Sequence, residues 1–129
     1  MADPGGECVE VVVTGPSAEW LAGFTRRLVD DRLVACGHVL GPMRAVYRWQ
    51  GEVYDEAQAR VGLHTRRSLV AEIVARADRD HPDDVPCVIA LPLVGGHPAY
   101  LQWVVDETSG PDGAGGPEAL DPDGGGGDA

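Results

Sequence analysis

A turn between two long strand-like segments is indicated by Tyr47-Arg48-Trp49-Gln50-Gly51, and this turn is the best clue to the fold. The segment before it, 35–48, contains Gly41-Pro42, and proline donates no ladder hydrogen bond, which indicates a bulge or bend. The segment after it alternates strictly, and its apolar face carries Ala57, Ala59, Val61 and Leu63. Alternate residues point to opposite faces, so His64 is expected to point away from the core. The sequence therefore predicts a long, kinked hairpin.

A strand and a helix are expected before the hairpin. Residues 9–14 are mostly β-branched and apolar and end at Gly15-Pro16, a pattern typical of a central strand followed by a turn. Ser17 is placed to cap a helix ending near Asp31. The apolar face of this helix consists of Trp20, Phe24 and Leu28.

A helix, a strand and a short helix are expected after the hairpin. Thr65 is a candidate cap for the second helix, which should end near Asp80. Its predicted buried stripe consists of Leu69, Val70, Ile73, Val74 and Ala77. Residues 88–91 form a fourth strand, and Pro98 begins a short helix that carries Tyr100, Leu101, Trp103 and Val104.

This order predicts an α+β fold, a ferredoxin-like split β-α-β sandwich with a long hairpin and a short C-terminal helix. Two helices would cover one face of a four-stranded antiparallel sheet and leave the other face open. The 129 residues suffice for one domain, predicted over 8–108. Residues 1–7 are expected to be a flexible N-terminus, and 109–129 a disordered, acidic, Gly-rich tail.

The hairpin is too long for the domain that carries it. Fifteen residues from Ala35 to Trp49 would extend roughly 45 Å at about 3.3 Å per residue, whereas a domain of about 100 residues has a radius of gyration near 13 Å. The overhanging tip would expose Tyr47 and Trp49 together with unpaired strand edges, which soluble proteins normally cover. The hairpin therefore predicts an oligomer, in which Trp49 serves as a packing anchor or as a ligand platform.

Composition excludes several classes of function. The net charge is −11, and about half of that charge falls in the tail, so nucleic acid is not an expected partner. All ten basic residues are arginine, which removes lysine chemistry. No apolar run approaches the roughly 20 residues that cross a bilayer, so no membrane partner is expected. The N-terminus lacks the pattern of a secretion signal, so we expect a cytoplasmic protein.

Cysteine and histidine supply the candidate metal ligands. The three cysteines are widely separated and form no CxxC pair, which argues against a disulfide framework or a zinc knuckle. Cys36 and His38 lie two apart on an expected strand and therefore share a face. Thiolate and imidazole suit Zn(II), Cu(I) or Cu(II). The alternative is a packed thiol beside a surface imidazole.

Several short motifs, in order, resemble the CutA family of divalent-cation-tolerance proteins over about residues 9–105. They are Val13-Thr14-Gly15-Pro16, Leu33-Val34-Ala35-Cys36, Tyr47-Arg48-Trp49-Gln50-Gly51, His81-Pro82 with Val85-Pro86, Ala90-Leu91-Pro92, and Tyr100-Leu101-Gln102-Trp103. The resemblance implies a homotrimer whose long hairpins pair between subunits. We expect Tyr47, Trp49 and Trp103 at that interface.

The departures from the family pattern cluster at polar positions of the cleft between subunits. His64 replaces the family's lysine, Gln58 replaces an acidic residue, and Asp84 is the acid kept in the altered motif 81–87. We expect Trp49, Glu56, His64 and Asp84 to line this cleft. Since a charged pair gives way to softer donors, the ligand preference is expected to be changed or lost.

The resemblance also bears on the metal ligands. His81 matches a histidine linked to copper binding in the family, while Val13 stands where some members carry a cysteine. We therefore take His81, Cys36 and His38 as candidate ligands of copper or another divalent cation. The alternative for His81 is a helix-terminating residue whose ring favours the negative helix end.

Two functions remain open from the sequence. The first is a non-enzymatic, cytoplasmic homotrimer that binds divalent or copper ions and supports metal tolerance. The second is a regulatory trimer whose cleft binds a small anionic ligand, aided by Arg66 and Arg67, or a protein partner. A third hypothesis is that the protein serves as a stable platform for assembly. His64 with Asp84 or Glu56 could form an acid-base pair, but the sequence offers no poised nucleophile, so we expect no enzymatic activity.

Overall fold

The computed structural model describes residues 7–109 and has the predicted order of elements. The strands are β1 (Cys8–Gly15), β2 (Cys36–Trp49), β3 (Glu52–Arg66) and β4 (Val88–Pro92). The helices are α2 (Ala18–Asp30), the 3₁₀ turn η1 (Arg67–Leu69), α3 (Val70–Asp80) and α4 (Pro98–Asp106). The predictions for the N-terminus and the tail concern segments that lie, but for one residue each, outside the described residues.

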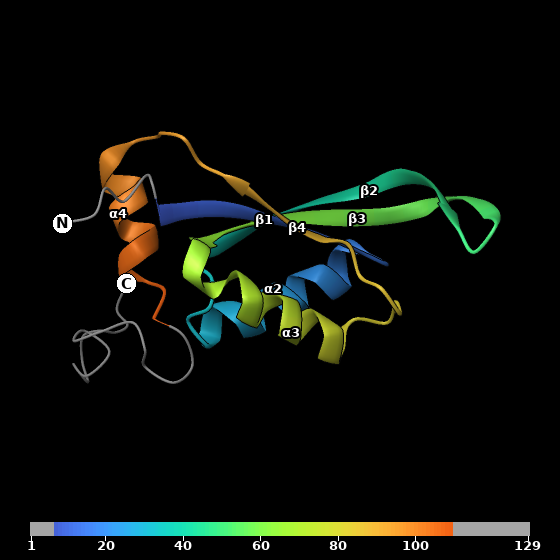
Figure 1. The fold of residues 1–129 in the computed structure, drawn as a ribbon, viewed down its shortest axis with the longest axis horizontal. Helices are drawn as coiled ribbons and strands as arrows, with labels where there is room; N and C mark the ends of the chain where they lie inside the picture. The colour runs from blue at the N-terminus through green and yellow to red at the C-terminus, as the bar shows by residue number, and fades with distance from the viewer. Residues whose placement is uncertain (1–6, 110–129) are drawn as a thin grey trace.

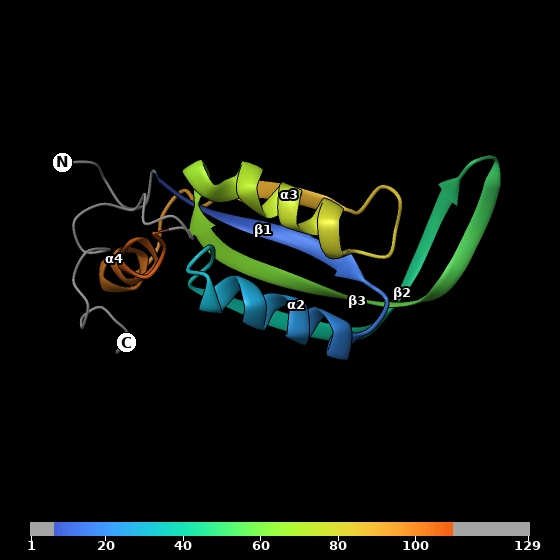
Figure 2. The same ribbon diagram turned by 90° about the horizontal axis from the view of Figure 1, so that it is seen from below.

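The four strands form one antiparallel sheet in the order β2-β3-β1-β4. Figures 1 and 2 show α2 and α3 side by side on one face of this sheet. Their apolar sides and the inward residues of β1 and β3 form the core, which includes Val11, Val13, Leu21, Phe24, Leu28, Val61, Leu63 and Ile73. The predicted α+β split β-α-β sandwich is confirmed.

The first helix begins where the sequence indicates. Ser17 is extended, and its hydroxyl accepts a hydrogen bond from the amide of Trp20 at 3.0 Å, which satisfies one free donor of the first turn. Phe24 and Leu28 are fully buried, and Trp20 stacks on Phe24 with ring centroids 5.2 Å apart. The four-residue spacing thus buries one stripe of α2 against the sheet.

The hairpin of β2 and β3 projects beyond the helical layer, as Figure 2 shows. The two strands pair from Cys36↔His64 to Trp49↔Glu52, and the register shifts between Leu40 and Met43, at the predicted Gly41-Pro42. Gln50 and Gly51 have φ of 51° and 83°, so the two-residue turn follows the right-handed twist of the strands. Glycine suits this position because it adopts positive φ without strain.

The expectation that Thr65 caps the second helix is wrong. Thr65 pairs with Val9 inside the sheet, and its hydroxyl donates to the carbonyl of Leu33 at 2.6 Å. Pairing with β1 keeps β3 extended as far as Arg66, so a 3₁₀ turn intervenes and α3 starts only at Val70, without a side-chain cap. The predicted stripe also shifts, because Ile73 and Ala77 are buried while Val74 remains 37% exposed.

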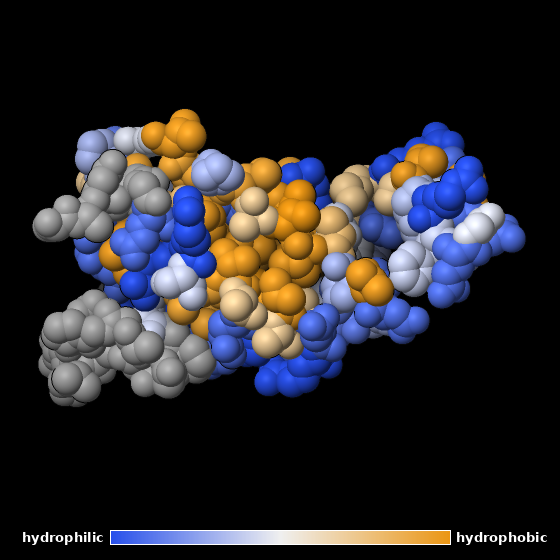
Figure 3. All heavy atoms as spheres, in the orientation of Figure 1, coloured by the Kyte–Doolittle hydropathy of each residue, from blue (hydrophilic) through white to orange (hydrophobic). Residues whose placement is uncertain are grey.

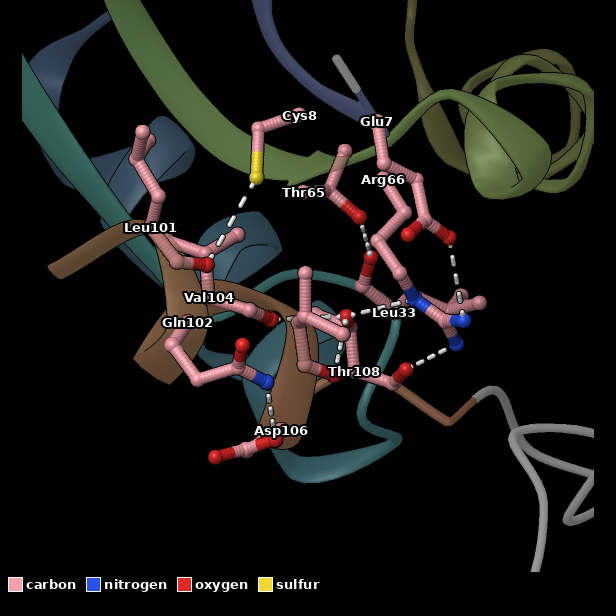
Figure 4. Close-up of polar contacts among 11 residues, drawn as sticks. Glu7, Cys8, Leu33, Thr65, Arg66, Leu101, Gln102, Val104, Asp106 and Thr108 are labelled. Carbon is pink, nitrogen blue, oxygen red and sulfur yellow. Dashed lines mark hydrogen bonds and ion pairs between the residues drawn. The ribbon is translucent and has the colours of Figure 1, made fainter. Parts of the chain in front are cut away.

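The helix α4 lies at the end of the sheet opposite the hairpin tip (Figure 1). Leu101 and Val104 pack with Cys8 in a second small core, and the Cys8 thiol donates to the Leu101 carbonyl at 3.7 Å. Figure 4 shows Arg66 between Glu7 and Thr108, where it donates to the hydroxyl and the carbonyl of Thr108. These contacts fasten the C-terminal end of α4 to β3.

Candidate metal centre

Three side chains of types that can ligate a metal meet on the sheet face opposite α2 and α3, which we call the open face. They are Cys36 and His38 of β2 and His64 of β3, and one potential ligand atom from each lies within 4.8 Å of the others. Cys36 is paired directly with His64, and His38 follows two residues along β2 on the same face. The hairpin register therefore adds His64 to the pair that sequence spacing predicts.

The donor spacing is close to that of a bound transition metal. The Cys36 Sγ lies 3.8 Å from Nδ1 of His64, and the rings of His38 and His64 have centroids 5.3 Å apart. With Zn–S near 2.3 Å and Zn–N near 2.0–2.1 Å, sulfur and nitrogen ligands of one ion stand about 3.5–3.8 Å apart. Only small side-chain movements would bring the three donors around one ion.

Glu10 of β1 lies beside the imidazole of His64. Its carboxylate lies 3.7 Å from Nε2, on the side of the ring opposite Cys36, as in sites where a carboxylate holds a metal-binding histidine. Glu10 pairs with His64 in the sheet, and Gly62 leaves room for it, since a Cβ there would lie 2.2 Å from Oε2 of Glu10. Burial lowers the pKa of His64, which favours the neutral imidazole that metals require.

Tyr100 of α4 covers this centre. Its hydroxyl lies 2.5 Å from Nδ1 of His64 and 3.2 Å from Sγ of Cys36. The pKa of Tyr100 is raised, mainly by burial and to a lesser extent by the hydrogen bond to Cys36. The phenol is therefore a neutral hydrogen-bonding group at neutral pH. No local sequence pattern places Tyr100 or Glu10 at this centre, because both reach it only through tertiary contacts.

The structure does not bring His81 to this cluster. His81 ends α3, its side chain is fully buried, and both ring nitrogens are engaged: Nε2 donates to the carbonyl of Thr14 at 2.7 Å and Nδ1 accepts from the amide of Asp83 at 3.0 Å. The ring also packs edge-on against Trp20. His81 therefore terminates the helix as the alternative expected, but its ring contacts β1 and the following loop and not the carbonyls at the helix end.

The expected cleft residues divide between two places. A groove of about 540 Å³ lies between the hairpin arm and the loop 82–87, and Trp49 and Asp84 line it. Glu56 stands beside it, where it accepts hydrogen bonds from Tyr47 at 2.5 Å and from Gln58 at 3.0 Å. His64, in contrast, belongs to the metal cluster.

The three residues expected at the subunit interface lie at opposite ends of the molecule. Tyr47 and Trp49 are on the hairpin tip, where Tyr47 stacks on Tyr54 with ring centroids 5.2 Å apart. Trp103 is on α4, 37% exposed and beside Tyr100. One interface containing all three would have to join the hairpin end of one copy to the α4 end of another.

Comparison with known proteins decides the family. Residues 9–107 match the family described as "CutA1 divalent ion tolerance protein". This chain is a member of the CutA1 family. The divalent-cation tolerance protein CutA of Thermus thermophilus is 33% identical over 98 residues, which cover 76% of this chain and 95% of that protein. The chloroplastic CutA protein of Arabidopsis thaliana is 33% identical over 100 residues.

Solved CutA1 structures share the fold. The crystal structure of CutA1 from Oryza sativa superposes with a TM-score of 0.76 at 32% identity, covering 79% of this chain and 94% of that one. The Thermus thermophilus protein gives a TM-score of 0.75. The chain spans only 55% of the length of the Arabidopsis relative. Within residues 7–109, no helix has the length and apolar character needed to span a membrane.

Proposed function

We propose that this CutA1-family protein is a non-enzymatic, cytoplasmic homotrimer that binds copper or another divalent transition metal through Cys36, His38 and His64. The observation that carries the proposal is the convergence of these three donors within 4.8 Å on the open face. The metal is the cargo of a tolerance protein in this proposal rather than a catalytic cofactor.

The donor set indicates which metals fit. One thiolate and two imidazoles favour borderline and soft ions such as Zn(II), Cu(II) and Cu(I) over Mg(II) or Ca(II), which prefer oxygen. The carboxylate of Glu10 would raise the basicity of the His64 imidazole and hold its orientation. Because the thiol must stay reduced to bind, a reducing compartment such as the cytoplasm suits this site.

Exposed apolar side chains support self-association. Val46 and Val53 on the hairpin are 63% and 60% exposed, and Leu40 on the open face is 64% exposed. Ile89 and Leu91 are exposed on the edge strand β4, which runs through the apolar area in the middle of Figure 3. An unpaired edge with exposed apolar residues is a surface that soluble proteins normally cover. A trimer joined through hairpins and edges would cover it.

The groove beside the hairpin supports the second function less well. The charged residues that line the groove are Asp83 and Asp84. Their negative charge favours a cationic ligand over a small anionic one. Arg66, a candidate anion ligand, is engaged with Glu7 and Thr108. These contacts leave the metal hypothesis as the better supported one.

Native mass spectrometry of the reduced full chain tests the proposal. Titration with Zn(II), Cu(II) and Cu(I) should give a trimer that takes up one ion per chain. The Cys36→Ala variant should lose this uptake, while Cys87→Ala, which changes an exposed thiol outside the cluster, should keep it. Uptake that persists in Cys36→Ala, or a chain that binds no ion, would contradict the proposed site.

A further inference from the structure

Tyr100 makes two contacts that matter for metal binding. Its hydroxyl lies 2.5 Å from Nδ1 of His64 and 3.2 Å from Sγ of Cys36, so it bridges two of the three candidate ligand atoms. We assign the neutral ring the tautomer with its proton on Nε2, toward the carboxylate of Glu10, and its lone pair on Nδ1. The phenol then donates to Nδ1, and the Cys36 thiol donates to the phenol oxygen.

A metal ion and the Tyr100 hydroxyl compete for the lone pair on Nδ1 of His64. The neutral imidazole has a single lone pair at Nδ1, which either accepts the proton of Tyr100 or binds a metal. Ligand atoms around one ion stand about 3 Å or more apart, so a separation of 2.5 Å between the Tyr100 oxygen and Nδ1 is too short for two ligands of the same ion. The Tyr100–His64 hydrogen bond must break when the ion binds.

The two ends of α4 are held by different contacts. At the C-terminal end, Arg66 donates to Thr108, and Arg32 donates to the carbonyl of Asp106 at 3.2 Å and lies 3.7 Å from Glu107. In the N-terminal half, the Tyr100 hydroxyl reaches Cys36 of β2 and His64 of β3, and the Cys8 thiol of β1 donates to the carbonyl of the buried Leu101. Loss of the Tyr100 contacts would therefore release α4 from β2 and β3 at its first turn, while the contacts with Cys8 and with the arginines keep the rest of the helix in place.

We propose that Tyr100 is a latch that metal binding opens: the ion replaces the Tyr100 hydroxyl at His64 and Cys36, and the Tyr100 side chain leaves the open face, which loosens the first turn of α4. This inference rests on the proposed metal function and adds a residue that regulates the same site. In the exchange, Nδ1 gives its lone pair to the ion, the thiol proton passes to solvent, and the phenol keeps its own proton and turns to water.

The latch would couple metal binding to a change in the contacts of α4. Trp103 is next to Tyr100, with ring centroids 5.6 Å apart, and is already partly exposed. Release of Tyr100 would break its ring contact with Trp103, a residue expected at the subunit interface, in the metal-bound state. Metal binding and release of Tyr100 are coupled, and such coupling is reciprocal. A partner that binds the released Tyr100 side chain would therefore also tighten metal binding.

The experiment compares the wild-type chain with Tyr100→Phe, which keeps the ring and removes the hydroxyl. Metal affinity is measured by competition with a chromophoric chelator, using Zn(II) and Cu(I) separately. Amide hydrogen exchange of the peptide covering 98–106 is followed by mass spectrometry with and without metal. Tyr54→Phe is the matched control, because Tyr54 stacks on Tyr47 in the hairpin, away from the cluster.

The latch predicts that metal changes amide exchange in the wild type but not in Tyr100→Phe. In the wild type and in Tyr54→Phe, metal should speed exchange in the first turn of α4. In Tyr100→Phe exchange should be fast without metal and insensitive to it, and affinity should rise about fivefold, the equivalent of one competing hydrogen bond of ordinary net strength.

Each other outcome overturns a defined part of the inference. Weaker binding by Tyr100→Phe would make Tyr100 a ligand and not a latch. Unchanged affinity together with unchanged exchange would remove the latch and leave the metal site standing. A wild-type chain and a variant that both fail to bind metal would overturn the proposed function as well.

Discussion

The Sγ of Cys36 lies 3.8 Å from Nδ1 of His64, although 28 positions separate the two residues in the sequence. The distance follows from the hairpin, whose register pairs these residues directly at its base. Their contact joins a thiol and an imidazole on one rigid pair of strands, which is a suitable support for a metal site because strands hold side chains more precisely than loops do.

Removing the thiol should abolish tight metal binding. Cys36→Ser keeps the size of the side chain but replaces the soft donor, and we expect affinity for Zn(II) or Cu(I) to fall by at least about 100-fold, beyond the effect usual for residues outside the ligand set. Chelator competition measures the loss. Cys87→Ser is the matched control and should bind as the wild type does.

Gly62→Ala should weaken the site without touching a ligand. Its new Cβ would meet Oε2 of Glu10 at 2.2 Å and push the flexible carboxylate away from His64. We expect metal affinity to fall about 10-fold, as when an orienting partner is lost, with little change in unfolding free energy. Glu10→Gln should reproduce the affinity loss. Full affinity in both variants would show that Glu10 does not support His64.

His81→Ala should destabilise the fold and leave metal binding intact. The change removes the partners of the Thr14 carbonyl and the Asp83 amide and the ring that packs on Trp20, so we expect a loss of about 2–4 kcal/mol. Urea unfolding measures the loss. Metal affinity is determined under conditions where the variant remains folded, and a large fall there would restore His81 as a ligand.

The hairpin pair Tyr47–Glu56 should respond to pH. The hydrogen bond to Glu56 raises the pKa of Tyr47 to about 12, and the same contact lowers the pKa of Glu56 below its ordinary value. A lowered carboxyl pKa stabilises the fold above the ordinary value and loses that contribution as pH falls through the folded value. Tyr47, with a raised pKa, contributes below its ordinary value of 10 and loses this as pH rises through about 12.

Glu56→Gln should remove both effects. Carbon-13 NMR of ring-labelled tyrosine should show the ionisation of Tyr47 at lower pH than in the wild type. The stability difference between wild type and variant should shrink as the solution is acidified through the titration of Glu56. An unchanged Tyr47 ionisation would mean that the contact with Glu56 does not persist in solution.

The hairpin should be needed for assembly. Val46→Asp places a charge on an exposed apolar position of the arm, and we expect it to convert the proposed trimer to monomers in analytical ultracentrifugation. Val94→Asp is the control, because Val94 is 98% exposed in the loop before α4, and this variant should remain trimeric. A Val46→Asp protein that stays trimeric would locate the interface elsewhere.

Local sequence patterns were sufficient to predict the order of elements and the hairpin. The local patterns are the alternation in β3, the four-residue spacing in α2 and the Gly41-Pro42 bulge. Each follows from local backbone preferences and from burial of one face, so each can be predicted without knowledge of the tertiary contacts. The same alternation placed His64 on the face away from the core, and two-residue spacing placed Cys36 beside His38.

The surroundings of these residues depend on tertiary contacts. Register across the sheet brought His64 to Cys36 and Glu10 to His64, and α4 brought Tyr100 over both. Pairing with β1 kept Thr65 in a strand against its local tendency to cap a helix, and burial engaged both nitrogens of His81 with the backbone. Contacts between residues far apart in the chain depend on how whole elements pair and pack, which no local pattern specifies.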